Sequence, residues 1–108
     1  MEDILKTRIQ SIIDGSHNVL FMKGSKHFPQ CGFSASAVEV LKRCGAEFET
    51  FNVLEDMEVR QGIKEFGNWP TIPQLYVGGK LVGGSDIVIE MYQSGELQPL
   101  VVPEPAGA

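Results

Sequence analysis

The sequence lacks three features that would define common classes of protein: a long apolar run, a cluster of basic residues, and a set of cysteines. A membrane-spanning helix needs about 20 consecutive apolar residues, and no stretch of the chain approaches that length. The start, Met1-Glu2-Asp3, is too polar for a secretory signal peptide. We therefore expect a soluble intracellular protein with no membrane contact.

Basic charge is scarce and scattered. The chain has 9 Lys and Arg against 14 Asp and Glu, a net charge of −5. Because affinity for nucleic acid rests largely on clustered basic side chains, we expect no nucleic-acid partner. The 108 residues, 43% of them hydrophobic, suit one domain with a real core. We expect a single domain over 1–102 and a disordered tail over 103–108.

Cysteine occurs only twice, as Cys31 and Cys44. If both flank one helix, the 13 positions from one to the other span roughly 20 Å, whereas a disulfide needs Cα atoms about 5.5 Å apart. We therefore expect no disulfide between them. Since His17 and His27 fall in other segments, the spacing does not match a four-ligand zinc site either.

Periodicity and turn residues predict the order α-β-α-β-α-β-β-α. The strand at 19–22 is a continuous apolar run, typical of a strand buried on both faces. This order predicts an α/β fold with a mixed sheet of four strands and helices on both of its faces. The expected helices cover 3–14, 33–43, 55–66 and 86–94, and the expected strands cover 19–22, 48–53, 74–77 and 80–82.

Cys31 is the first candidate for chemistry, because it lies in a loop that leads directly into a helix. The free N–H groups and dipole at a helix N-terminus favour a thiolate, so its pKa should be lowered. The alternative is a buried structural thiol. Position 34, where a two-cysteine redox motif has its second thiol, is Ser34, so disulfide exchange needs a thiol from elsewhere. Cys44 is interpreted as a core or surface cysteine.

Two further groups of candidates have ordinary alternatives. A cis bond before Pro73 would turn the backbone of Ile72 toward a neighbouring loop, where it could pair with an extended peptide; equally, the proline only breaks a loop. Lys23, Arg60 and Asp86 are ordinarily a solvated lysine, a surface arginine and a helix N-cap. They matter for function only if the fold brings them to the thiol.

Five segments together resemble the monothiol glutaredoxins with a Cys-Gly-Phe-Ser active site. The resemblance runs from about residue 4 to residue 101, in the family's order and spacing. The segments are Lys23-Gly24, Pro29-Gln30-Cys31-Gly32-Phe33-Ser34, Val59-Arg60-Gln61-Gly62, Asn68-Trp69-Pro70-Thr71-Ile72-Pro73-Gln74 and Val82-Gly83-Gly84-Ser85-Asp86-Ile87.

The resemblance implies a thioredoxin-like fold and a glutathione site beside Cys31. It implies that Lys23 and Arg60 pair with the glycine carboxylate of glutathione. The backbone of Ile72 would bond to the cysteinyl residue, and Ser85 and Asp86 would hold the γ-glutamyl end. Two cations, a strand-like backbone and an acidic residue at a helix N-terminus are chemically suited to this tripeptide.

The resemblance also implies a [2Fe-2S] cluster between two subunits, ligated by the Cys31 thiolate and one glutathione thiolate from each side, which supplies four sulfur ligands. The partners implied are a cluster-bridged homodimer or a heterodimer, and apo iron–sulfur proteins as recipients. The chain departs from the family pattern at Ser85, where many relatives have cysteine. It departs also at Lys26-His27, which alters the charge of the loop.

Three functions follow as hypotheses. The first is a carrier that transfers [2Fe-2S] clusters to apo-proteins. The second is a glutathione-dependent thiol–disulfide oxidoreductase, at most a weak enzyme, that removes glutathione from proteins through Cys31. The third is a regulatory module that senses iron or redox state through a partner. The expected compartment is the cytoplasm, or the chloroplast stroma if a transit peptide has been removed.

Overall fold

The computed structural model describes residues 1–103, which form five α-helices, one 3-10 helix and four strands. The α-helices are α1 (Asp3–Asp14), α2 (Gly32–Arg43), α3 (Met57–Phe66), α4 (Ser85–Ser94) and α5 (Leu97–Val101), and the 3-10 helix is η1 (Val53–Glu55). The strands are β1 (Asn18–Met22), β2 (Glu49–Asn52), β3 (Gln74–Val77) and β4 (Lys80–Gly83).

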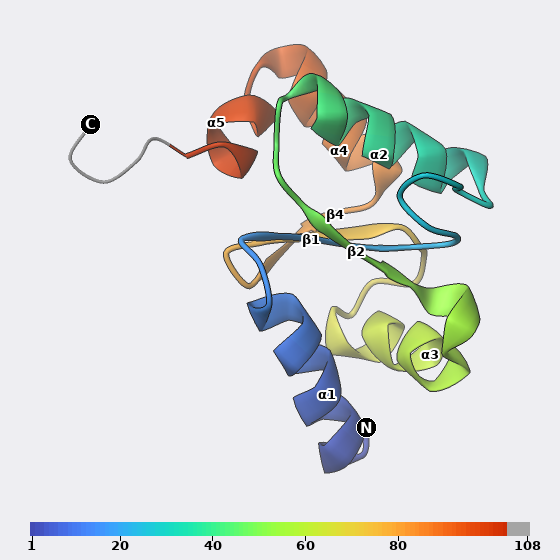
Figure 1. Ribbon diagram of the computed structural model, residues 1–108. Helices are drawn as coiled ribbons and strands as arrows, with labels where there is room; N and C mark the ends of the chain where they lie inside the picture. The colour runs from blue at the N-terminus through green and yellow to red at the C-terminus, as the bar shows by residue number, and fades with distance from the viewer. Residues whose placement is uncertain (104–108) are drawn as a thin grey trace.

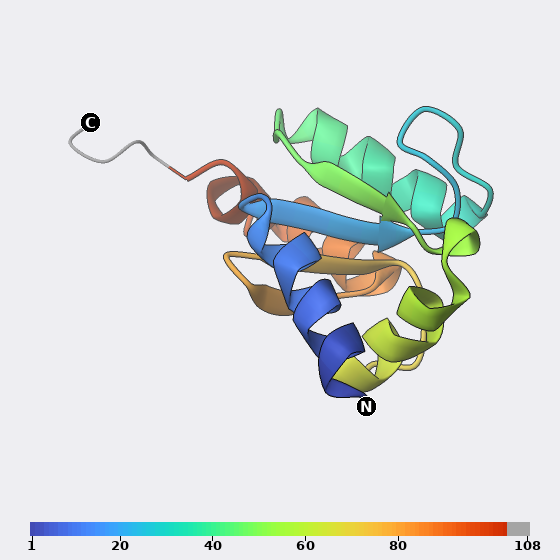
Figure 2. The ribbon, with the colours of Figure 1, turned by 60° about the horizontal axis from the view of Figure 1, so that its bottom comes forward.

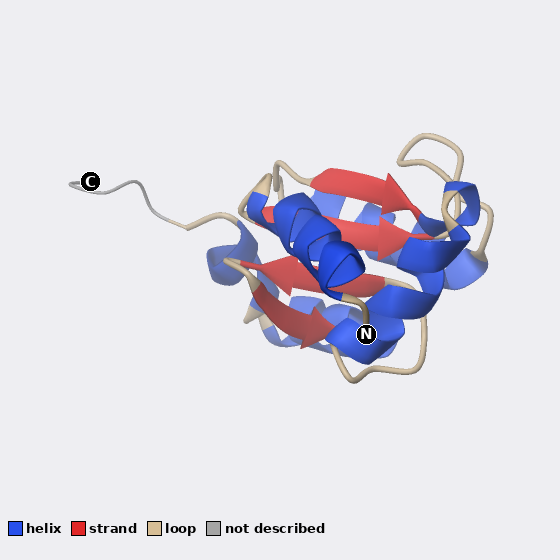
Figure 3. Ribbon diagram, turned by 90° about the horizontal axis from the view of Figure 1, so that it is seen from below, coloured by secondary structure: helices blue, strands red, loops and turns tan. Residues whose placement is uncertain are grey.

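The four strands make one mixed sheet in the order β2-β1-β3-β4. Strand β1 runs parallel to β2 and antiparallel to β3, and β3 runs antiparallel to β4. Helices α1 and α3 lie on one face of the sheet and α2, α4 and α5 on the other (Figures 1 and 2). The view from below shows α1 crossing in front of the strands (Figure 3). The predicted α/β sheet with helices on both faces is confirmed.

Strand β1 lies between two hydrophobic cores, one on each face of the sheet. Its side chains alternate: Leu20 and Met22 pack toward α2 and α4, while Val19 and Phe21 pack toward α1 and α3. All five of its residues are buried, as the continuous apolar run predicts. No helix within residues 1–103 is long and apolar enough to cross a membrane.

The predicted element order is correct apart from two additions. Val53, expected in the second strand, begins η1 instead, where the side chain of Asn52 accepts the Leu54 N–H. Helix α5 was not predicted; it follows Gly95, whose φ of 82° ends α4 as expected. The predicted disordered tail covers 103–108, and all of it after residue 103 lies outside the described residues.

Candidate thiol site

Cys31 occupies the N-cap of α2, and its thiol is half-buried at the surface. Its backbone is extended (φ −147°, ψ 135°), and helical geometry begins at Gly32. Phe33 in the first turn is 64% exposed, whereas Ser34 is fully buried. The predicted position of the thiol, at the start of a helix, is therefore confirmed.

The surroundings of Cys31 favour the thiolate. The backbone N–H of Ser34 is the largest cause that lowers the pKa of Cys31, followed by the N–H of Phe33, the charge of Lys23 and, as the smallest cause, the side-chain hydroxyl of Ser34. Partial burial acts in the opposite direction but does not cancel these effects. The lowered pKa agrees with the expectation for a thiol facing the free N–H groups of a helix.

Hydrogen bonds to three different segments fix the loop that precedes Cys31. The Lys23 N–H donates to Ser34 Oγ at 3.1 Å, and the Gly24 N–H donates to Asn52 Oδ1 at 2.9 Å. The Gln30 N–H closes the loop on the Lys23 carbonyl at 2.9 Å. The start of the loop is therefore tied to α2, to the end of β2 and to its own last residues.

The ammonium of Lys26 contacts Phe48, a residue distant in the sequence. Lys26 Nζ donates to the Phe48 carbonyl and lies 4.2 Å from the centroid of the Phe48 ring. A cation over an aromatic face is attracted by the ring quadrupole. Lys26 therefore adds charge to the loop and also holds the loop against the residue that precedes β2.

A cavity of about 490 Å³ opens beside Cys31. Five of the six predicted site residues line it, from four separate segments: Lys23, Cys31, Ile72, Ser85 and Asp86. The lining of the cavity includes the cations Lys23 and Lys64 and the acidic start of α4. Such a combination can bind a zwitterionic extended molecule beside the sulfur.

Arg60 does not line this cavity, whereas Lys64, one turn later in α3, does. Seven further residues of the wall were not predicted as site residues, although all of them except Lys64 lie in the segments that resemble the family. For Trp69 and Thr71, their position beside the Ile72-Pro73 pair was the available signal. The cavity residues not singled out are Phe33, Lys64, Trp69, Pro70, Thr71, Gly84 and Ile87.

The wall that faces Cys31 is built from the 69–73 loop and the start of α4. The Ile72–Pro73 bond is cis, the first of the two alternatives that the sequence left open. Gly84, not Asp86, is the N-cap of α4, so the ordinary reading of Asp86 as a cap was wrong. A Cβ on Gly84 would lie 3.3 Å from both Trp69 Nε1 and the Pro73 carbonyl. Glycine therefore allows the helix to begin in close contact with this loop.

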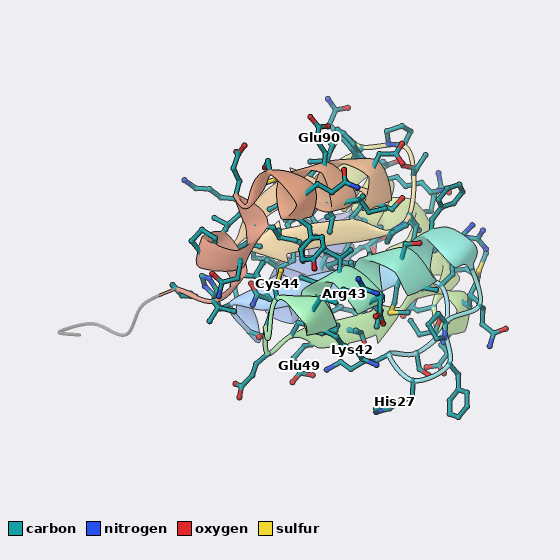
Figure 4. The ribbon with its side chains drawn as sticks, turned by 90° about the horizontal axis from the view of Figure 1, so that it is seen from above. His27, Lys42, Arg43, Cys44, Glu49 and Glu90 are labelled. Atoms are coloured by element: carbon teal, nitrogen blue, oxygen red, sulfur yellow. The ribbon has the colours of Figure 1, made fainter. Side chains whose placement is uncertain are left out.

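Cys44 lies at the opposite end of α2 and is buried. In Figure 4 it is well separated from His27 on the loop that leads to Cys31. Burial raises the pKa of the Cys44 thiol. Both cysteines are free, as predicted, and within residues 1–103 no group of three or more His, Cys, Asp or Glu side chains could hold a metal ion.

A four-stranded mixed sheet with helices on both faces and a single accessible cysteine at the start of α2 define the class of the protein. It has a thioredoxin-like fold with one thiol in its site. Similarity to known proteins assigns a family within this fold, because the family model described as "Glutaredoxin" matches residues 18–82.

The chain belongs to the monothiol glutaredoxin family. It is 56% identical over 96 residues to a protein of Synechocystis sp. named "Uncharacterized monothiol glutaredoxin ycf64-like", covering 89% of this chain and 90% of that one. It is 49% identical to "Monothiol glutaredoxin-S14, chloroplastic" of Arabidopsis thaliana, covering 87% of this chain but 54% of the relative. It is 52% identical to human "Glutaredoxin-3", covering 90% of this chain and 29% of that protein.

Solved structures agree with the fold. The solution structure of reduced poplar apo GrxS14 is 53% identical, with a TM-score of 0.77, and the match covers 87% of this chain and 86% of that one. A buckwheat glutaredoxin–glutathione complex is only 22% identical, with a TM-score of 0.80 over 91% and 87% of the two chains. At that identity the similarity supports the thioredoxin-like fold alone.

Proposed function

We propose that this protein binds glutathione in the cavity beside Cys31 and, with it, a [2Fe-2S] cluster that it transfers to apo iron–sulfur proteins. The observation that carries the proposal is one accessible, activated thiol, Cys31, with no second thiol at position 34 and a charged cavity next to it. Such a site needs a second sulfur from outside the chain.

The cavity suits glutathione at both ends. Lys23 and Lys64 provide positive charge for the glycine carboxylate, and Asp86 with the N-terminus of α4 suits the zwitterionic γ-glutamyl end. The Ile72 backbone is the predicted partner of the cysteinyl residue, and Ser85 lies in the first turn of α4. Arg60 remains a prediction for the same carboxylate as Lys23.

The proposed cluster is cargo shared between two subunits. Four sulfur ligands are required, and the described part of one chain has a single accessible thiol. Two Cys31 thiolates and two glutathione thiolates complete the set. Phe28 and Phe33, which are 74% and 64% exposed, precede and follow Cys31 in the sequence and offer apolar surface for a homodimer or a heterodimer.

The lowered pKa of Cys31 also supports a second function, removal of glutathione from proteins. The Cys31 thiolate would attack the glutathione sulfur of a mixed disulfide and release the protein thiolate. A glutathione thiolate would then attack the new disulfide, releasing oxidised glutathione and restoring Cys31. This reaction needs no second cysteine in the chain.

Anaerobic reconstitution with iron, sulfide and glutathione tests the carrier function. We expect a coloured dimer by visible absorption and native mass spectrometry, formed by wild type and by Cys44→Ser but not by Cys31→Ser. Transfer is then followed from the loaded dimer to an apo-ferredoxin. A failure of wild type to form a coloured dimer with glutathione present, or equal formation by Cys31→Ser, would overturn the proposal.

Glutathione binding can be followed separately through the single tryptophan, Trp69, which lines the cavity. We expect its fluorescence to change as glutathione is added, with weaker binding in Lys23→Gln and unchanged binding in Lys80→Gln, a lysine at the β3–β4 hairpin outside the cavity. Equal affinities of the two variants would contradict a role for Lys23.

The oxidoreductase function has a test of its own. Brisk reduction of a small glutathionylated substrate by the wild-type protein would favour it.

A further inference from the structure

Ser34, the last residue of the Cys-Gly-Phe-Ser motif, is buried and hydrogen-bonded to the main chain of the preceding loop. Its exposed fraction is 0%, and its Oγ accepts the Lys23 N–H at 3.1 Å. Lys23 is the first residue after β1, and Ser34 is in the first turn of α2. The hydroxyl therefore joins the end of the central strand to the helix that carries Cys31.

The other hydrogen bonds of the Lys23-Gly24 backbone do not connect it to α2. The Lys23 carbonyl is held by Gln30 and the Gly24 N–H by Asn52. Gly24 has a φ of +93°, and a Cβ there would lie 2.5 Å from the Gln30 nitrogen, so the loop passes too close for any side chain. Gln30 and Asn52 fix the loop to itself and to β2, but Ser34 fixes it to α2.

We infer that Ser34 is a positioning residue: its hydroxyl fixes the Lys23 backbone to the first turn of α2 and so holds the Lys23 ammonium beside the Cys31 sulfur. The inference deepens the proposed function, because it rests on Cys31 as the reacting thiol and Lys23 as its cation. Serine at position 34 then has a role of its own, beyond the absence of a second thiol.

The chemistry of the side chain supports this assignment. Alanine at position 34 would leave the partly buried Lys23 N–H without an acceptor, and an unsatisfied donor is costly. A thiol is only a weak acceptor, so cysteine would also loosen the link. Threonine keeps the oxygen. The same helix offers a matched control, since Ser36 Oγ bonds to the Gly32 carbonyl at 3.0 Å without touching the loop.

The test measures the thiolate of Cys31 in the protein without glutathione or cluster. Absorbance at 240 nm is titrated against pH for wild type, Ser34→Ala, Ser34→Thr and Ser36→Ala, and alkylation of Cys31 by iodoacetamide is followed by peptide mass at pH 6. We expect Ser34→Ala to raise the pKa of Cys31 and to slow alkylation roughly two- to fivefold, the range of a partly exposed charge interaction. Ser34→Thr should restore the rate, and Ser36→Ala should match wild type.

The Ser34 hydroxyl also lowers the pKa of Cys31 directly, as the smallest of the causes. A double-mutant cycle with Lys23→Gln therefore separates action through the lysine from this direct action on the sulfur. If Ser34 acts through Lys23, Ser34→Ala should slow alkylation much less when Lys23 is already replaced. An equal slowing in both backgrounds, or no slowing in either, would overturn the inference. Because the protein is measured without ligand, these outcomes are distinct from a failure to bind glutathione or cluster.

Amide hydrogen exchange in the wild type gives a measurement that does not depend on the folding of any variant. The Lys23 amide should exchange more slowly than that of His27 in the exposed part of the same loop, because its N–H is donated to Ser34 Oγ. Equal exchange at the two amides would also contradict the inference.

Discussion

At the scale of single residues, the two ends of α2 give its two cysteines opposite chemistry. Cys31 faces the free N–H groups of the first turn, which lower its pKa, whereas Cys44 is buried at the last turn, which raises its pKa. A thiolate is the nucleophile and the metal ligand. The fold therefore favours the thiolate at Cys31 and the protonated thiol at Cys44.

Cys31 and Cys44 should differ in their rates of alkylation. At pH 7 in native protein, iodoacetamide should modify Cys31 at least about tenfold faster than Cys44, because reactivity follows thiolate fraction and exposure. The measurement is the mass of the two cysteine peptides over time. In 6 M guanidinium chloride the two rates should converge, and persistence of the difference there would show that it does not come from the fold.

Tyr76 gives a prediction on alkaline pH. Burial raises its pKa from 10.0 to about 12, and its hydroxyl donates to Gln74 Oε1 at 3.0 Å. The unfolded chain loses this proton near pH 10, while the folded protein keeps it until about pH 12. The contribution of Tyr76 to the free energy of unfolding should therefore be fully present below pH 10 and should be lost as the pH rises toward 12. Urea unfolding should show a shallower fall for Tyr76→Phe, and an unchanged slope would contradict the assignment.

How much of the site can be predicted from sequence depends on how local each cause is. The lowered pKa of Cys31 depends on a helix that starts at the next residue, so the motif alone predicts it. The presence of Lys64 in the cavity instead of Arg60 depends on how α3 is rotated over the sheet. The contact of Lys26 with Phe48 spans 22 positions in the chain, and nothing in either segment indicates it.

At the scale of elements, α1 and α3 pack closely through Gly62. A Cβ at this position would lie 2.8 Å from Leu5 Cδ2 and 3.0 Å from Ile9 Cδ1. The helix hydrogen bonds alone would favour alanine over glycine by roughly 0.5–1 kcal/mol, but inserting a methyl group into a packed contact costs about 1–3 kcal/mol. The packing cost is therefore the larger of the two.

Gly62→Ala should accordingly lower the free energy of unfolding by about 1 kcal/mol, as measured by urea denaturation. Leu5→Ala should remove the nearer contact, so the double variant should lose less than the sum of the two single losses. Gly32→Ala is the control, because a Cβ at that helical position meets nothing within 4 Å. A stabilising effect of Gly62→Ala would contradict the close packing.

Most elements could be predicted because each has its own local pattern and boundary. The 3.6-residue period and Gly15 define α1, and Asp56 caps α3 by accepting the Val59 N–H at 3.1 Å. Helix α5 was missed because its five residues include Pro99 and contain less than two turns. Its helical form comes with burial of Leu97 and Val101 against the α4 side of the core, a tertiary cause that a short window does not contain.

At the scale of the whole molecule, the sheet register brings the site together. Phe21 pairs with Gln74 in the antiparallel β1–β3 ladder, so Lys23 after β1 and Ile72 before β3 lie at the same edge of the sheet. The parallel β1–β2 pair delivers Asn52 to that edge as well. Residues from distant parts of the chain thus converge on Cys31 because of strand order.

At the opposite edge of the sheet, the side chain of Asn18 joins three segments of the chain by hydrogen bonds. Its side chain is 1% exposed, and Nδ2 donates to the Glu47 carbonyl at 2.9 Å and to the Val101 carbonyl at 2.7 Å. The amide therefore links the start of β1 to the segment before β2 and to the end of α5. His17 reaches the same helix through an exposed bond to the Leu100 carbonyl at 3.1 Å.

Asn18→Ala should lower the free energy of unfolding by about 2 kcal/mol, because it leaves two carbonyls without their donor in or near the core. His17→Ala, which removes only an exposed bond to the same helix, should cost less than about 0.5 kcal/mol. Urea denaturation gives both values, and amide exchange should show the loss first at Val101 and Val102, since α5 is short and held by these contacts. Equal losses in the two variants would mean that α5 is held by Leu97 and Val101 alone. The pKa of Cys31 should be unchanged in Asn18→Ala, because Asn18 and Cys31 lie at opposite edges of the sheet.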